Sequence, residues 1–182
     1  MNAGALAPAE DAIGVGLGGV GMAALLTAVS LGHGRGIGVD AVPAKLDRAR
    51  ELGADEVYTP DEAMDAGIRT PLVVEAAGHP RAFETAFALT APGGRTVTVG
   101  LPAPAARSEI SPLTITAEAR TIIGSYLGSA VPARDIPRYA QLWREGRLPV
   151  EELISDTIVL DDINTAMDTL ADGKAIRQII RF

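Results

Sequence analysis

Five glycines fall within the nine residues GVGLGGVGM, which occupy positions 14 to 22. Six of these positions, Gly16 to Gly21, read G-x-G-x-x-G. Glycine weakens a helix and fills no core, so such a run indicates a loop whose backbone must turn sharply or approach a ligand. In this pattern Gly16 allows the turn, Gly18 lets the main chain approach the ligand, and Gly21 lets a helix pack against a strand. Free backbone N–H groups at the start of a helix favour an anion, such as a diphosphate.

A carboxylate follows this loop at the distance that a dinucleotide-binding unit requires. Asp40 ends the next apolar run, nineteen residues after Gly21, and about 20 is usual for the acid that binds a ribose. A carboxylate there accepts hydrogen bonds from ribose hydroxyls and repels a 2′-phosphate. No arginine follows it immediately, so the pattern favours NAD over NADP. Lys45 either reaches the same ribose or is a solvated helix lysine, and its spacing leaves both open. The other interpretation of the glycines is that they serve strand–helix packing alone.

Two later strand ends could complete a binding surface. EAAG, from Glu75 to Gly78, and VGLP, from Val99 to Pro102, each end an apolar run in small residues. Ligands of open parallel sheets lie beyond the carboxyl ends of the strands, and small residues there leave space for a flat nicotinamide ring. A purely structural role for these two turns is equally consistent with the sequence.

The elements that must position these residues alternate between strand and helix. Short β-branched runs between helical segments predict a parallel sheet that is covered on both faces. The sequence therefore predicts an α/β protein with a doubly wound parallel sheet, the Rossmann NAD-binding fold. We predict strands at 12–15, 37–39, 56–59, 72–75 and 95–99, helices at 22–31, 44–52, 61–65 and 80–89, and a turn at the sequence APGG, 91–94.

The rhythm changes after Gly100. Three prolines between 101 and 113 predict a loop. Asp161 is the predicted cap of a helix that runs to Ala171, with Gly173 just past its end. We predict further strands at 121–126, 157–159 and 177–182, and a further helix at 138–144.

Composition excludes several classes of function. The formal net charge of −7 argues against nucleic acid or an anionic membrane as a partner. The chain has no cysteine and two histidines, His33 and His79, which leaves a poor donor set for zinc, iron or copper. No apolar run approaches the ~20 residues that cross a bilayer, and no basic segment precedes an apolar one as in a signal peptide. We expect a cytoplasmic protein.

The motifs, taken together and in order, resemble a known family. GLGGVG, VDAVPAKLDRARELGAD, VVEAAG, APGGRTVTVGLP, IIGSYLGS and LDDINTAMDTLADGKAIRQIIRF are similar to the cofactor-binding half of medium-chain, zinc-type alcohol dehydrogenases. The similarity runs from about Asp11 to Phe182. It implies NAD as the cofactor, and an alcohol or carbonyl compound as the substrate of the full enzyme.

The resemblance also implies roles for particular residues. The main chain at Ser125 and Leu127 would hold the nicotinamide carboxamide, on a strand that in the family commonly lies at a dimer seam, so we expect a homo-oligomer. Arg177 would pair with the pyrophosphate; without the family it would be interpreted as a surface arginine. The implied cofactor-binding residues are Gly16, Leu17, Gly18, Gly19, Val20, Gly21, Asp40, Lys45, Ala76, Ala77, Gly78, Val99, Gly100, Leu101, Ser125, Leu127 and Arg177.

The chain departs from the family in one large respect. The cysteine and histidine zinc ligands and the proton relay of the family's catalytic half are absent from this sequence, so zinc is expected only in that half and the chain alone is expected to be inactive. We expect a dinucleotide-binding domain over 11–127 and a segment over 128–182 that folds back towards the catalytic half. An apolar face of Ile176, Ile179, Ile180 and Phe182 is expected to be exposed or buried by self-association.

Two other functions are alternatives to this one. A short-chain dehydrogenase needs a Tyr-x-x-x-Lys pair, but Tyr58, Tyr126 and Tyr139 are followed four residues later by Glu, Ala and Trp. That class is therefore set aside. A non-enzymatic NAD-sensing domain, which would bind the cofactor and signal to a partner, stays open as the alternative.

Overall fold

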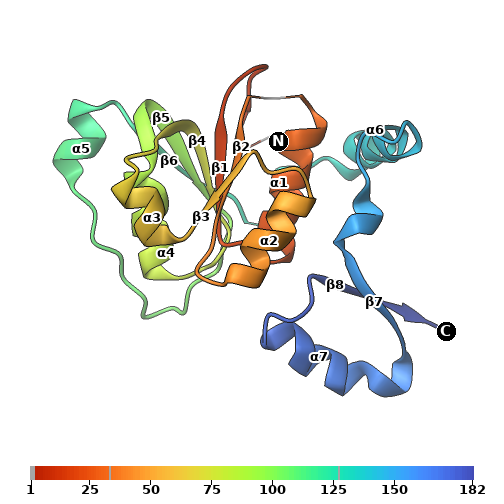
Figure 1. Ribbon diagram of the computed structural model, residues 1–182. Coiled ribbons are helices and arrows are strands. Elements are labelled where there is room, and N and C mark those ends of the chain that lie inside the picture. Colours follow the sequence, from red (N-terminus) through yellow and green to blue (C-terminus); the bar gives the residue numbers. More distant parts are fainter. Residues whose placement is uncertain (1–2, 33, 127) are drawn as a thin grey trace.

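The computed structural model describes residues 3–32, 34–126 and 128–182. Its larger sheet consists of β1 (Ala12–Val15), β2 (Gly36–Val39), β3 (Glu56–Tyr58), β4 (Thr70–Glu75), β5 (Thr90–Thr98) and β6 (Thr121–Gly124). All neighbours in this sheet are parallel, in the order β3-β2-β1-β4-β5-β6 (Figure 1). The chain thus starts in the middle, fills one edge, and returns to fill the other, which is the doubly wound order of the Rossmann fold. The predicted fold class is confirmed.

Helices connect the strands of this sheet. Five of the helices begin with a proline, whose fixed φ and missing N–H suit the first turn. The helices that follow strands of the large sheet are α1 (Gly19–Ser30), α2 (Pro43–Glu51), α3 (Pro60–Asp65), α4 (Pro80–Ala88), α5 (Pro112–Ala117) and α6 (Pro132–Arg144).

The two faces of β1 and β2 carry different side chains. Ile13 and Ile37 point to one face, where they pack with Ala63 of α3 and Ala86 of α4. The other face has glycine, and a Cβ at Gly38 would lie 3.1 Å from Leu17 Cδ1. Glycine on that face therefore lets the start of α1 lie close against the sheet.

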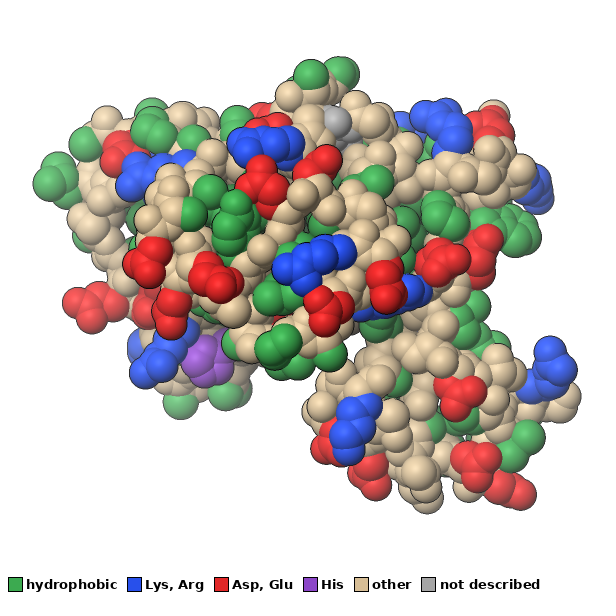
Figure 2. Space-filling view, in the orientation of Figure 1, with side chains coloured by type: hydrophobic (Ala, Val, Ile, Leu, Met, Phe, Trp, Pro, Cys, Tyr) green, Lys and Arg blue, Asp and Glu red, His purple; other side chains and the backbone are tan. Residues whose placement is uncertain are grey.

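Part of the chain beyond β6 packs against helix α1. Leu142, Leu148 and Leu153 are buried in the same apolar cluster as Met22 and Leu25 of α1. A smaller unit follows and forms a separate lobe beside the main body (Figures 1 and 2). It consists of the 3-10 turn η1 (Val150–Leu153), β7 (Ile154–Val159), the 3-10 turn η2 (Leu160–Asp162), α7 (Ile163–Ala171) and β8 (Arg177–Arg181), with β7 and β8 paired in parallel.

Some predicted elements differ from the structure. The sequence APGG lies inside β5 and not in a turn before it, because the register shifts between the pairs Thr70–Thr90 and Leu72–Arg95 and the extra residues form an irregularity, with Gly93 at φ +71°. Helix α5 begins at Pro112, inside the predicted loop over 101–113, and continues to Ala117, where the sequence predicts no element. Helix α6 begins at Pro132 and contains Pro137, although a helix was predicted only after that proline.

Two helix starts also differ. Helix α1 begins at Gly19, three residues before the predicted start at Met22, because the last glycines of the loop are already helical. Asp161 lies in the η2 turn, and α7 is preceded by Asp162, whose side chain makes no capping hydrogen bond. No helix among the described residues is both long and apolar enough to cross a membrane.

Candidate cofactor site

The three motif glycines differ in what a side chain would meet. Gly16 has φ +87°, and a Cβ there would lie 2.6 Å from the backbone nitrogen of Ala77. A Cβ at Gly21 would overlap the carbonyl oxygen of Gly16, whereas one at Gly18 would find no atom within 4 Å. Packing therefore requires glycine at positions 16 and 21. At Gly18 it does not, and the missing side chain leaves open space at the start of α1.

Positive charge converges on this space. Gly18 caps α1 with no side-chain hydrogen bond, and the first turn contains no acidic residue. The first N–H groups of a helix have no partner within it and carry partial positive charge. The Arg177 guanidinium, from β8, occupies the position that a Cβ of Gly19 would take. A cation beside the positive end of a helix is favourable only when an anion lies between them, so the arrangement suits a phosphate.

Asp40 lies at the carboxyl end of β2 and is almost wholly buried. Its Oδ2 accepts a hydrogen bond from the backbone nitrogen of Leu17 at 2.7 Å, and its Oδ1 accepts one from that of Val42 at 2.9 Å. Lys45 Nζ lies 3.7 Å from Oδ2. Each carboxylate oxygen can accept more than one hydrogen bond, so Asp40 keeps capacity for hydroxyl groups of a ligand.

The lobe formed by η1 to β8 reaches Lys45 as well. A Cβ at Gly173, in the turn after α7, would lie 3.5 Å from Lys45 Cε. Gly173 thus lies beside Lys45, and Arg177 lies beside Gly19. Two residues of the lobe therefore lie next to predicted cofactor-binding residues.

The two small-residue turns interlock at the carboxyl ends of β4 and β5. The backbone nitrogen of Ala76 donates to the carbonyl of Val15 at 2.8 Å, which fixes the first turn to the end of β1. Gly78 has φ +67°, and a Cβ there would lie 2.9 Å from the backbone nitrogen of Leu101. A Cβ at Gly100 would overlap the backbone nitrogen of Gly78. The turns are therefore in backbone contact.

Glu75 holds these turns together, and the sequence analysis assigned it no role. Its side chain is buried, with 1% of the residue exposed. Oε1 accepts hydrogen bonds from the backbone nitrogens of Ala77 at 2.8 Å and Gly78 at 2.7 Å, and Oε2 accepts one from the Thr98 hydroxyl at 2.6 Å. Its position in the sequence could have indicated this role, because Glu75 is a charged residue at the end of a buried strand. A buried carboxylate needs hydrogen-bond donors.

A cavity of about 220 Å³ brings further predicted residues together. Val20, Val99 and Ser125 all line it, and the backbone nitrogen of Ser125 donates to the carbonyl of Thr98 at 3.0 Å. The predicted residue Leu127 lies outside the described residues.

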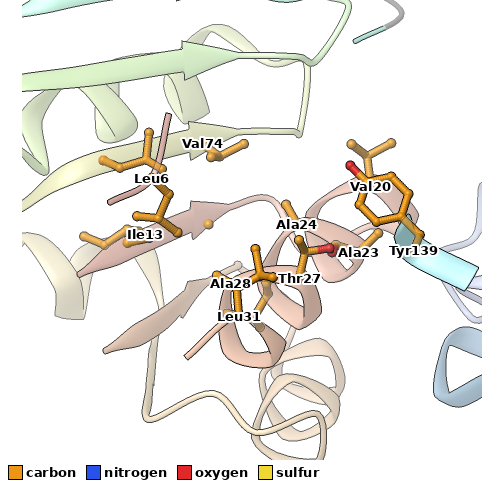
Figure 3. Close-up of a pocket in the computed structure, with 14 residues that line it drawn as sticks. Leu6, Ile13, Val20, Ala23, Ala24, Thr27, Ala28, Leu31, Val74 and Tyr139 are labelled. Atoms are coloured by element: carbon orange, nitrogen blue, oxygen red, sulfur yellow. The ribbon is translucent and has the colours of Figure 1, made fainter. Parts of the chain in front are cut away.

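A second cavity, of about 330 Å³, lies between α1 and strands β1 and β4 (Figure 3). The side chains of Leu6, Ala24, Val74 and Tyr139 contribute to its lining, which is predominantly apolar. Its lining offers no cationic group to a phosphate, so we do not place the pyrophosphate there.

Two carboxylates with lowered pKa values belong to an ionic network around Arg35. The Arg35 backbone N–H, and then its guanidinium, lower the pKa of Asp11 against the effect of desolvation. The Tyr58 hydroxyl, and then Arg35, lower the pKa of Glu56. Asp11, Arg35 and Glu56 lie at the amino ends of β1 to β3, away from the glycine loop, so this network belongs to the framework. No group of three or more His, Cys, Asp or Glu side chains suited to a metal ion occurs in the described part of the chain.

Comparisons with known proteins identify the family of the chain. Residues 19–145 match the family model described as zinc-binding dehydrogenase. The chain is 34% identical over 178 residues to alcohol dehydrogenase 1 of Zea mays, an alignment that covers 91% of this chain and 46% of that protein. Alcohol dehydrogenase 2 of Zea mays is 31% identical over 177 residues, with the same coverage. The chain thus spans about half the length of the curated relatives it matches.

Solved structures extend the likeness over the whole chain. An alcohol dehydrogenase zinc-binding domain protein from Burkholderia ambifaria superposes with a TM-score of 0.92 at 28% identity, over 100% of this chain and 50% of that one. Benzyl alcohol dehydrogenase from Acinetobacter calcoaceticus gives a TM-score of 0.92 at 26% identity, over 100% and 52%. The chain therefore belongs to the zinc-binding dehydrogenase family, and its described fold is the Rossmann-like nucleotide-binding part of that family.

Proposed function

We propose that this chain binds NAD(H) as the coenzyme domain of a zinc-type alcohol or aldehyde dehydrogenase. The observation that carries the proposal is the Arg177 guanidinium against Gly19, beside the uncapped start of α1 and the open space at Gly18. An anion is the ligand that such a site favours. The alcohol dehydrogenases among the relatives supply the reaction class.

Each part of the coenzyme then has protein groups to contact. The α1 amides and Arg177 bind the pyrophosphate, and Asp40 with Lys45 binds the adenosine ribose. The turns Ala76 to Gly78 and Val99 to Leu101 border the nicotinamide, with the main chain of Ser125 at its carboxamide. Bound NAD supplies a hydride acceptor, and the residues of this chain orient its ring.

We propose further that this chain alone binds the coenzyme without turning over alcohol. The substrate and the zinc ion would bind to groups of the full-length enzyme that this sequence does not contain, with residues 128–182 facing that part and 11–127 forming the coenzyme domain. A coupled assay with NAD, zinc and a panel of alcohols tests this. Zinc-dependent turnover by this chain would contradict it.

Calorimetry with NAD⁺ and NADP⁺ tests the coenzyme site. We expect NAD⁺ to bind at least about tenfold more tightly, because Asp40 repels a 2′-phosphate. Asp40→Ser should reduce that preference, whereas Asp47→Ser, an exposed acid on α2, should not. Equal affinities of the unsubstituted chain for the two coenzymes would contradict the role of Asp40.

A further inference from the structure

The Glu75 carboxylate is the point where two turns meet. It binds the first turn through the N–H groups of Ala77 and Gly78, and it binds β5 through the Thr98 hydroxyl. The second turn is bound to the same residue, because the backbone nitrogens of Val99 and Gly100 donate to the Glu75 carbonyl at 2.8 and 3.3 Å.

None of the ion pairs between described residues includes Glu75. Three hydrogen-bond donors surround its two oxygens, and each donor is a neutral group. It also lines a cavity of about 260 Å³ beyond the ends of β4 and β5, together with Gly78, Thr98 and Gly100. Its negative charge is thus held in a poorly hydrated position beside the turns.

We propose that Glu75 is a positioning residue for the nicotinamide end of the coenzyme, and that its charge favours the oxidised ring. The inference rests on the proposed binding of NAD(H). The hydrogen bonds of Glu75 set the relative position of the two turns that border the ring. The ring carries a positive charge in NAD⁺ and none in NADH, so a nearby buried carboxylate attracts the oxidised form selectively.

Glu75→Gln tests the charge. The amide oxygen of glutamine still accepts from Ala77 and Gly78, and the Thr98 hydroxyl can accept from its NH₂ group. We expect the affinity for NAD⁺ to fall more than that for NADH, and the ratio of the two affinities to fall roughly three- to tenfold. ADP-ribose, which lacks the nicotinamide, should bind as before. Calorimetry measures all three ligands.

Thr98→Val tests the tether separately. It removes the hydroxyl that donates to Oε2 and leaves the charge of Glu75 and its backbone hydrogen bonds in place. We expect NAD⁺ and NADH to weaken together by a few-fold, with their ratio and the ADP-ribose affinity unchanged. The control Asp65→Asn removes one negative charge from the exposed end of α3, and should change none of these affinities.

The possible outcomes separate this inference from the proposed function. Failure of the unsubstituted chain to bind ADP-ribose would refute the coenzyme site itself. Equal affinities of that chain for ADP-ribose and for both coenzymes, or an unchanged NAD⁺ to NADH ratio in Glu75→Gln, would overturn the role of Glu75 alone. An equal fall for ADP-ribose would make Glu75 merely structural. If circular dichroism shows that Glu75→Gln does not fold, the Thr98→Val variant becomes the test of the proposal. Affinities of Thr98→Val for NAD⁺ and NADH equal to those of the unsubstituted chain would then overturn it.

Discussion

Gly16 and Gly18 lie two residues apart and are glycines for different physical reasons. At Gly16 the backbone has a positive φ and contacts Ala77, so the protein itself excludes a side chain. At Gly18 no protein atom lies near the position of a Cβ, so packing would tolerate a methyl group. Only the second glycine is explained by a ligand.

We expect Gly16→Ala and Gly18→Ala to separate stability from binding. Gly16→Ala should lower the free energy of unfolding by more than about 2 kcal/mol, because it strains φ and displaces Ala77. Gly18→Ala should change that free energy by about 1 kcal/mol or less, yet weaken NADH at least about tenfold by filling the open space. Urea unfolding and calorimetry measure the two effects. Normal NADH binding by Gly18→Ala would place the pyrophosphate elsewhere.

The second prediction at the residue scale concerns the contribution of Arg177 to coenzyme affinity. Arg177→Ala should weaken both NADH and ADP-ribose about tenfold, since a charge-assisted hydrogen bond to phosphate is lost. The salt dependence of binding should decrease as well. Arg181→Ala, in the same strand and also exposed, is the matched control and should leave affinity and salt dependence unchanged. Identical behaviour of the two variants would refute the role of Arg177.

At the scale of the elements, an ionic network joins the amino ends of three adjacent strands. Arg35 precedes β2, and its guanidinium binds Asp11 beside β1 at 2.8 Å and Glu56 of β3 at 2.7 Å. The Asp11 carboxylate also accepts from the Arg35 backbone nitrogen at 2.7 Å. The candidate site lies at the carboxyl ends of the strands. The ionic network therefore stabilises the end of the sheet opposite to the one proposed to bind the coenzyme.

This network makes stability dependent on pH. The pKa of Asp11 is lowered in the folded chain, chiefly by the Arg35 backbone N–H, so its contribution is present above the unfolded pKa and is lost as pH falls through the folded pKa. Asp11→Asn should lower the free energy of unfolding by about 0.5 to 1 kcal/mol at neutral pH. The difference from the unsubstituted chain should shrink below about pH 4. Urea unfolding at several pH values measures it; a difference that is constant with pH would contradict the assignment.

At the scale of the whole molecule, the lobe from η1 to β8 has only two buried residues among those described, Leu153 and Ala166. Sheet β7-β8 has two strands, so each strand has an unpaired edge within the described chain. Ile179 is exposed and Phe182 is 98% exposed, as the sequence predicted, whereas Ile176 packs partly against the main core and Ile180 is half-buried. Exposed apolar residues beside open strand edges favour association.

We expect the chain to self-associate through this lobe as its concentration rises. The double variant Ile179→Thr, Phe182→Ser should shift the equilibrium towards monomer, because it removes exposed apolar area beside β8. Leu113→Ser removes an exposed apolar side chain from α5, outside the lobe, and serves as the control. Light scattering over a concentration series measures the mass. A monomer at all concentrations, or an equal effect of the control, would contradict this prediction.

Much of the fold could be predicted because its signals are local. Apolar runs such as 12–15 and 72–75, and helices opened by Pro43 and Pro80, were placed within a few residues. The irregularity in β5 could not be predicted, because a glycine-rich stretch marks a turn or a bulge equally well. Its outcome depends on the pairing of β5 with β4. The start of α6 was missed because Pro137 is itself a typical first residue of a helix.

The sequence by itself determined the glycine loop, the acid after β2 and the strand-and-helix alternation, because backbone sterics and spacing act between near neighbours. Only the tertiary structure decided that Arg177 lies on Gly19, that Gly100 contacts Gly78, and that Glu75 is the hub of two turns. The Glu75–Thr98, Gly78–Gly100 and Gly19–Arg177 contacts join residues that are far apart in the sequence, and no local pattern specifies them. The first two arise because the parallel sheet brings the carboxyl ends of β4 and β5 to one edge, and the third because the Arg177 side chain of β8 reaches the start of α1.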